Sequence, residues 1–240
     1  MPGGSGPSSP LQAVVVLMLV ASVLFAAGCD STGPSSGPGE STTLEDSLSK
    51  SFRLFNADLV GVWQSGSSIA DVNGDGNPDI LLAGADSALT PTAALYFGNG
   101  DGSFSKAQID PRGVFVKSST SIEDVNGDAH PDLFLTGDDV HNAPLQELFL
   151  GDGTGSFTKA ETDLEGGEGG QSSFADFNED GKPDLLITGR EGGYLLDSRV
   201  YLGNGDGTFS KIDTDLPGNE LGSHSIGDVN EDGIPDLLLT

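Results

Sequence analysis

The sequence predicts an all-β fold, a β-propeller built from four-stranded antiparallel blades of about 52 residues each. Three observations favour this fold. An acidic nine-residue segment recurs four times, a glycine-rich segment recurs with the same step, and short strand-like stretches lie between them. No helical periodicity competes with this pattern outside the N-terminal region.

The acidic segments share the pattern Asp-x-Asn-x-Asp-x-x-Pro-Asp, and their first residues are separated by 53, 52 and 52 positions. These segments are Asp71–Asp79, Asp124–Asp132, Asp176–Asp184 and Asp228–Asp236. The glycine-rich segments that follow are Leu95–Phe104, Leu148–Phe157 and Val200–Phe209. A repeat of this length is typical of propellers and other repeat arrays.

Each repeat contains four strand signals. A β-suited stretch such as Ser68–Ala70 precedes the acidic segment, and an apolar run such as Ile80–Leu82 follows it, as expected for a strand buried on both faces. The third strand is predicted at Ala93–Phe97 and its equivalents. The fourth strand follows the glycine-rich segment, whose Asn-Gly and Asp-Gly pairs favour a hairpin turn.

The repeats set a register for the whole of residues 51–240. The chain opens with a fourth strand near Ser51–Phe55, continues through three full blades, and stops after a second strand at Thr240. We therefore expect a truncated propeller of three full blades plus partial ones. The alternative is that a partner supplies the missing strands, because open blade edges are prone to aggregation.

Composition excludes several classes of protein. The 240 residues include 37 Asp+Glu and 10 Lys+Arg, for a net charge of −27. A binder of nucleic acid and a polybasic membrane-surface protein both need a positive surface, so this strongly negative charge excludes both classes. With one cysteine, a disulfide-stapled fold is impossible.

The N-terminus predicts export. Ala13–Ala27 is apolar apart from Ser22, and its 15 residues suit the core of a signal peptide better than a membrane-spanning helix. The Ala-Ala-Gly-Cys sequence ending at Cys29 resembles the lipobox of bacterial lipoproteins, which implies lipidation of Cys29 and a signal peptide over residues 1–28. The alternative is an ordinary secretory signal with an incidental cysteine. Residues 29–50 are rich in Ser, Gly and Pro and are predicted to be a flexible linker.

The acidic segments predict metal sites. Positions 1, 3, 5 and 9 of each segment carry side-chain oxygens, and the varied seventh residue is expected to offer its backbone carbonyl. Calcium takes about 6–8 oxygen ligands, whereas magnesium demands stricter octahedral geometry. An EF-hand is excluded because position 12 is apolar, as at Leu82. The candidate ligands for up to four Ca²⁺ ions are Asp71, Asn73, Asp75, Asp79, Asp124, Asn126, Asp128, Asp132, Asp176, Asn178, Asp180, Asp184, Asp228, Asn230, Asp232 and Asp236.

One acidic segment could be merely a tight turn, since Asp, Asn, Gly and Pro all favour turns. Four segments in register, each with three aspartates, favour calcium instead, because a divalent cation removes the repulsion between the carboxylates. Glycine at position 6 permits a positive φ, and Ala129 replaces it in the second segment. We expect that site to be strained or weaker.

These repeats resemble the FG-GAP/VCBS family, known from the β-propeller of integrin α subunits and from many bacterial surface proteins. The resemblance rests on the four acidic segments and on Phe97-Gly98, Leu150-Gly151 and Leu202-Gly203. It implies calcium within a blade hairpin, with ligands at the positions given above. The family usually has seven blades, more than this chain can form.

The loops at the end of the blades opposite the acidic segments vary between repeats, as binding surfaces often do. They carry aromatic and cationic residues on an otherwise acidic chain: Trp63, Phe115, His141, Tyr194, Arg112 and Arg190. We expect this face to bind an extracellular protein or glycan, in adhesion or recognition. The alternative for the aromatic residues is simple packing between blades.

An enzyme is the weaker expectation. A calcium-dependent polysaccharide-degrading enzyme, or a non-catalytic part of one, is the alternative function, because calcium can act as a Lewis acid. No nucleophile–base pattern is found, and His130, His141 and His224 occupy non-equivalent repeat positions. No catalytic residue is therefore predicted. A purely structural spacer is a third class that the sequence does not separate from these two.

Overall fold

The computed structural model describes residues 15–18, 52–55, 58–109, 111–141, 143–166, 171–191, 195–217 and 223–239. These residues form strands, turns and bends without any helix, as predicted for an all-β chain. Accordingly, no described segment is a long apolar helix of the kind that crosses a membrane. Most of the predicted signal peptide, Cys29 and the linker lie outside the described residues.

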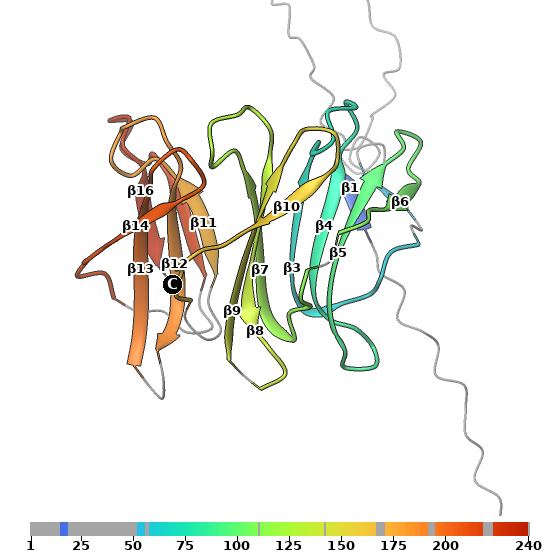
Figure 1. The fold of residues 1–240 in the computed structure, drawn as a ribbon, viewed down its shortest axis with the longest axis horizontal. Helices are drawn as coiled ribbons and strands as arrows, with labels where there is room; N and C mark the ends of the chain where they lie inside the picture. Colours follow the sequence, from blue (N-terminus) through green and yellow to red (C-terminus); the bar gives the residue numbers. More distant parts are fainter. Residues whose placement is uncertain are drawn as a thin grey trace, which may run out of the picture.

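Each of the three complete repeats forms one four-stranded antiparallel sheet, which confirms the predicted blade (Figure 1). In every blade the strands neighbour one another in chain order. Blade 1 consists of β3 (Trp63–Ala70), β4 (Asp79–Ala85), β5 (Pro91–Gly98) and β6 (Phe104–Lys106). Blade 2 consists of β7 (Val116–Glu123), β8 (Asp132–Asp138), β9 (Pro144–Gly151) and β10 (Phe157–Ala160). Blade 3 consists of β11 (Ser172–Ala175), β12 (Asp184–Glu191), β13 (Leu195–Gly203) and β14 (Phe209–Ile212).

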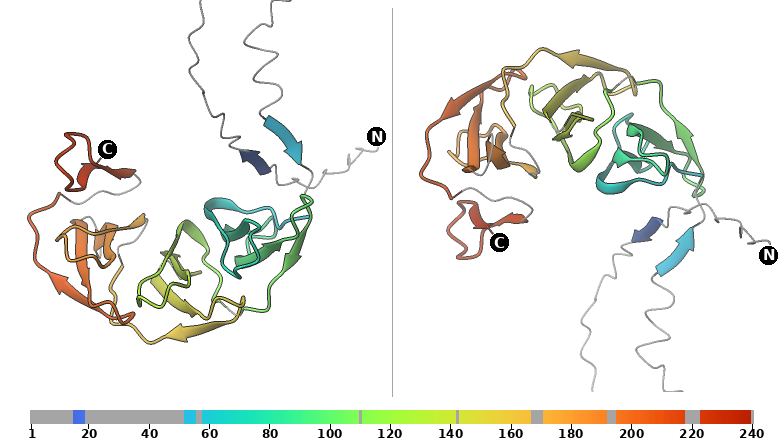
Figure 2. Two further views of the ribbon diagram at one scale, coloured as in Figure 1. Left: turned by 90° about the horizontal axis from the view of Figure 1, so that it is seen from above. Right: turned by 90° about the horizontal axis from the view of Figure 1, so that it is seen from below.

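A fourth blade is begun by β15 (His224–Gly227) and β16 (Asp236–Leu239), which pair antiparallel like the first two strands of the complete blades. Figure 2 shows the blades side by side in an open arc, with β6, β10 and β14 along its outer edge. The first strands of neighbouring blades approach one another on the inner side of this arc. The described chain is thus an open, propeller-like array and not a closed ring.

The strand expected near Ser51–Phe55 is present as β2 (Phe52–Phe55). It pairs antiparallel with β1 (Val15–Met18), from within the apolar stretch that the sequence assigns to the export signal. The two strands form a separate two-stranded sheet, so β1 is the antiparallel neighbour of β2 as the third strand is of the fourth in the complete blades.

The core lies between the blades. Every residue of β4 and β8 is buried, as the apolar runs predict for strands covered on both faces. Leu81 of blade 1 packs in one cluster with Leu133 and Phe149 of blade 2. Burial of each such side chain contributes about 1.5–3 kcal/mol.

The second position of the acidic segments shows how much a blade depends on the next one. Val72 and Val125 are 0% and 2% exposed, whereas Val229 in the partial blade is 85% exposed. Val72 packs against residues of blade 2, and Val125 packs against residues of blade 3. Blade 2 therefore covers the second residue of the acidic segment in blade 1, and blade 3 covers the equivalent residue of blade 2.

Polar bonds also join the inner strands of successive blades. The Ser68 hydroxyl of β3 lies 2.7 Å from the Thr120 hydroxyl of β7, and Ser121 of β7 donates to the Ser172 carbonyl of β11 at 3.2 Å. At the next junction His224 replaces the hydroxyl, with its Nε2 2.7 Å from Ser173 Oγ. The equivalent residue pairs thus form a polar ladder around the inner side of the arc.

Candidate metal sites

The four acidic segments form tight loops, and each joins the first two strands of a blade. In the first loop, Asp71 Oδ1 accepts the N–H of Gly74 at 2.8 Å and Oδ2 accepts the N–H of Gly76 at 2.8 Å. Asp124 accepts the corresponding bonds from Gly127 and Ala129, each at 2.8 Å. The first aspartate therefore organises the loop backbone around its own carboxylate.

The backbone of each loop is left-handed at two positions. Position 6 has a positive φ throughout, including +68° at Ala129, as the sequence predicts for this site. Position 4 is left-handed as well, and here Glu179 and Glu231 adopt φ values of +60° and +62°. A non-glycine residue in this region costs roughly 1–2 kcal/mol, so the loops retain some strain.

The side chains at positions 3 and 5 lie next to one another on the surface. Asn73 Nδ2 donates to Asp75 Oδ2 at 3.2 Å, and Asn73 Oδ1 accepts the Asp75 N–H at 3.0 Å. Asp75 Oδ1 accepts the N–H of Asn77 at 2.7 Å. The same bonds recur in the second loop between Asn126, Asp128 and His130.

The ninth residue is the buried member of each set in the complete blades. Asp132 is 1% exposed, and its two oxygens accept the N–H groups of Val125 at 2.9 Å and Gly151 at 2.8 Å. Asp79 and Asp184 make the equivalent bonds, with Gly98 and Gly203 as the second donors. This aspartate therefore joins its own loop to the end of the third strand, a role that the sequence pattern did not indicate.

The glycines that donate to these aspartates admit no side chain. A Cβ on Gly98, Gly151 or Gly203 would lie 2.1–2.3 Å from the carbonyl oxygen of the loop proline. The aspartate and its glycine are always 19 residues apart. That constant spacing is the signal in the sequence that could have identified the pair.

Electrostatics disfavour the charged form of two of these buried carboxylates, Asp132 and Asp79. Burial raises the pKa of Asp132, with repulsion from Asp128 and Asp124 adding to it and the two N–H bonds opposing it. Asp79 has a raised pKa for the same reasons, with Asp75 and Asp71 as its neighbours. A cation held among these oxygens would reverse the repulsion.

The donors at each site are oxygens only, which fits a hard cation such as calcium. Each carboxylate oxygen of Asp79 accepts one N–H and has a further lone pair for a metal. Among the residues that the structure describes, no three His, Cys, Asp or Glu side chains converge into a preformed metal cluster. The carboxylates bond the loop backbone instead.

The predicted ligand face lies at the opposite end of the blades. Trp63 begins β3 opposite Ala85 and is 41% exposed, His141 is exposed in the turn after β8, and Phe115 is half-buried. Among the described residues, no ring contact includes Trp63 or Phe115. Tyr194 and the side chain of Arg190 lie outside the described residues.

Arg112 has a structural partner at this end. Its Nε and its backbone N–H donate to the two carboxylate oxygens of Glu147, both at 2.8 Å, and Lys159 Nζ donates to Oε1 at 2.7 Å. Glu147 is 1% exposed. Sequence reasoning placed Arg112 on the ligand face but missed this buried acceptor, because the pair joins the loop before blade 2 to its third strand.

Comparison with known proteins agrees with the repeat pattern. A curated relative, a T-cell immunomodulatory protein homologue from Plasmodium yoelii yoelii, is 27% identical over 136 residues, which cover 50% of this chain and 19% of the relative. The chain therefore matches about a fifth of the length of that protein.

Among solved structures, an Agrocybe aegerita lectin described as recognising non-reducing terminal N-acetylglucosamine superposes with a TM-score of 0.51. The superposition has 21% identity and covers 71% of this chain and 45% of the lectin, and it supports the propeller-type fold.

The family model of the FG-GAP-like repeat matches residues 71–135, 124–187 and 176–239. The chain belongs to the FG-GAP-like repeat family.

Proposed function

We propose that this chain is an extracytoplasmic calcium-binding propeller scaffold that presents a binding face for a protein or glycan at the cell surface. The observation that carries the proposal is the recurrence of one oxygen-only donor set in every blade, built on the same backbone geometry. Sites repeated in every blade suit a scaffold better than a single catalytic centre.

Calcium would act here as a cross-link. In the first site the ion would be held by Asp71, Asn73, Asp75 and Asp79, with the carbonyl of Asn77 as a further donor. Bound calcium supplies positive charge that neutralises the carboxylates and ties the loop to the strand ends. Since Asp79 also bonds Gly98, an ion at this site would stiffen the connection between the loop and the third strand.

Calcium titration followed by calorimetry and thermal melting tests this proposal. Extracellular modules bind calcium with Kd of about 10⁻⁴–10⁻³ M, and free calcium at ten times Kd adds about 1.4 kcal/mol per site. We expect excess calcium to raise the melting temperature, and magnesium to do so less. A melting curve that is unchanged by both calcium and chelator would refute the metal assignment.

The binding face is proposed at the variable-loop end. Regular strands with variable connecting loops are a common basis for recognition, and the lectin with a similar fold binds a sugar according to its description. Immobilised glycans, including chains that end in N-acetylglucosamine, provide the first panel. We expect Trp63→Ala to weaken binding at least as much as His141→Ala. Thr154→Ala, in a glycine-rich turn at the other end, is the control, and an equal loss there would contradict the assignment.

Attachment to a membrane is proposed through Cys29 only. A lipidated Cys29 followed by the linker of residues 29–50 would hold the repeats clear of the bilayer. Mass spectrometry of the mature protein would show a diacylated N-terminal cysteine, and Cys29→Ser would appear in the soluble fraction. A mature protein that begins elsewhere would support the ordinary secretory signal instead.

A further inference from the structure

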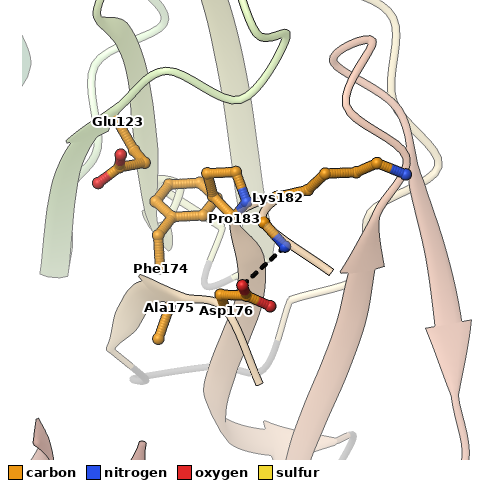
Figure 3. A pocket seen from close by; sticks show the side chains of 7 residues that line it. Glu123, Phe174, Ala175, Asp176, Lys182 and Pro183 are labelled. Atoms are coloured by element: carbon orange, nitrogen blue, oxygen red, sulfur yellow. Dashed lines mark hydrogen bonds between the residues drawn. The ribbon is translucent and has the colours of Figure 1, made fainter. Parts of the chain in front are cut away.

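A pocket of about 300 Å³ opens between blades 2 and 3, at the end where the acidic loops lie (Figure 3). Its residues come from two sources. Glu123 ends β7 of blade 2, and blade 3 supplies the end of β11 and part of its acidic loop. The residues from blade 3 are Phe174, Ala175, Asp176, Gly181, Lys182 and Pro183.

This pocket departs from the repeat at two positions. The residue that ends the first strand is Glu123 in blade 2, but Ala70 in blade 1 and Ala175 in blade 3. The residue two positions before the acidic loop is Phe174 in blade 3, whereas the other blades have an isoleucine there, as at Ile122. The same backbone folds without these residues in the other blades, so folding alone does not require them.

The pocket is aromatic on one side and anionic on the other. Phe174 is half-buried and packs edge-on against Phe134, with ring centroids 5.9 Å apart. Figure 3 shows Glu123 next to the Phe174 ring. Within the described residues, no hydrogen bond or ion pair is found for the Glu123 carboxylate, which is exposed.

Lys182 does not neutralise this site. Its ammonium group lies 3.7 Å from Asp180 Oδ2, and Figure 3 shows its side chain extending away from Glu123. The chain as a whole carries a net charge of −27, so the field at this face favours a positively charged guest. An exposed carboxylate beside an aromatic ring is the pair of groups that holds a cationic side chain by ion pairing and cation–π contact.

We propose that this pocket between blades 2 and 3 receives an arginine or lysine side chain of a partner protein. The cation lies against Phe174 and forms an ion pair with Glu123. Asp176 keeps its hydrogen bonds within the acidic loop, where its Oδ2 accepts the Gly181 N–H at 2.8 Å. The site is at the opposite end of the blades from Trp63 and His141, and it does not depend on the binding face proposed there.

The probe is the blocked peptide acetyl-Gly-Arg-Gly-amide, titrated into the full chain in excess calcium and again in chelator, with backbone amide NMR shifts as the readout. We expect saturable shifts at Glu123 and at residues 174–176, in both conditions. The neutral peptide with Gln in place of Arg should produce none. N-acetylglucosamine is titrated in parallel, because a sugar could also stack on Phe174.

Two variants replace a pocket residue by the residue that other blades have at the equivalent position, so both variants should fold. Glu123→Ala should weaken binding of the Arg peptide about three- to fivefold, and Phe174→Ile should weaken it about two- to threefold. Glu179→Gln removes an exposed carboxylate that does not line the pocket and is the charge-matched control.

Equal weakening by Glu179→Gln and Glu123→Ala would show general attraction to an acidic surface and would overturn the proposal. Saturable binding of N-acetylglucosamine at residues 174–176 without binding of the Arg peptide would overturn it in favour of a sugar site. Loss of the calcium response alone would leave this proposal standing and refute only the metal assignment.

Discussion

Replacing Asp132 by Asn tests the structural role of the buried ninth aspartate. In the folded chain its two oxygens accept the N–H groups of Val125 and Gly151. Asparagine can accept only one of these bonds, and its own amide then faces the other N–H donor. A hydrogen bond to a charged group is worth about 1.5–3 kcal/mol, so one lost bond sets the scale of the effect.

A second contribution acts in the opposite direction. Burial and the repulsion from Asp128 and Asp124 raise the pKa of Asp132, which shows that its negative charge is disfavoured in the fold. Removing the charge recovers part of the loss. We therefore expect Asp132→Asn to destabilise the chain by about 1–3 kcal/mol in the absence of calcium, a fall in melting temperature of roughly 2–10 °C.

The assay is thermal melting in chelator, with Asp128→Asn as the matched control. Asp128 belongs to the same loop and bonds only exposed groups, such as the N–H of His130 at 2.9 Å. Its replacement should shift the melting temperature by less than about 2 °C in chelator. An Asp132→Asn variant as stable as the wild type, or a control that loses as much, would refute the reasoning. In calcium, both variants should lose the stabilisation that one site provides.

Three further predictions follow from the same structure. Glu147→Ala should cost about 2–3 kcal/mol in denaturant unfolding, because the buried acceptor of Arg112 and Lys159 is lost; a change under about 0.5 kcal/mol would contradict this. Burial lowers the pKa of His224 in the folded chain below its unfolded value of about 6.5. Below pH 6.5 the imidazole of the unfolded chain therefore binds a proton more readily than that of the folded chain, and stability should fall as the pH drops. Melting curves of His224→Ser should show a smaller drop between pH 7.5 and pH 5. Ala129→Gly should stabilise the second loop by about 1 kcal/mol and tighten calcium binding there, because glycine adopts the φ of +68° found at this position without steric cost. An unchanged or weaker calcium affinity by calorimetry would count against it.

Local chemistry accounts for what the sequence predicted correctly. Apolar runs and turn residues act over about ten neighbouring residues or fewer, so the blades and their loops could be located from the pattern alone. The apolar run at Leu133–Leu135 predicted a strand covered on both faces, and β8 is fully buried. Glycine at position 6 predicted a left-handed backbone, which even Ala129 adopts.

Contacts between elements could not be predicted in the same way. The bond from Gly151 to Asp132 depends on the register of the third strand against the loop. The pairing of Ser121 with Ser172 depends on how closely two blades approach. The acceptor of Arg112 was missed for the same reason, since Glu147 becomes its neighbour only when blade 2 is assembled.

The sequence by itself determined the repeat, the four strands of each blade, the position of the acidic loops and the oxygen donors that they carry, because each of these depends on residues close together in the chain. Only the tertiary structure decided which donors are buried, which residues bridge successive blades, and that Glu123 of one blade shares a pocket with Phe174 of the next. The physical reason is that equivalent residues of two blades lie about 52 positions apart in the chain and come into contact only when the blades pack.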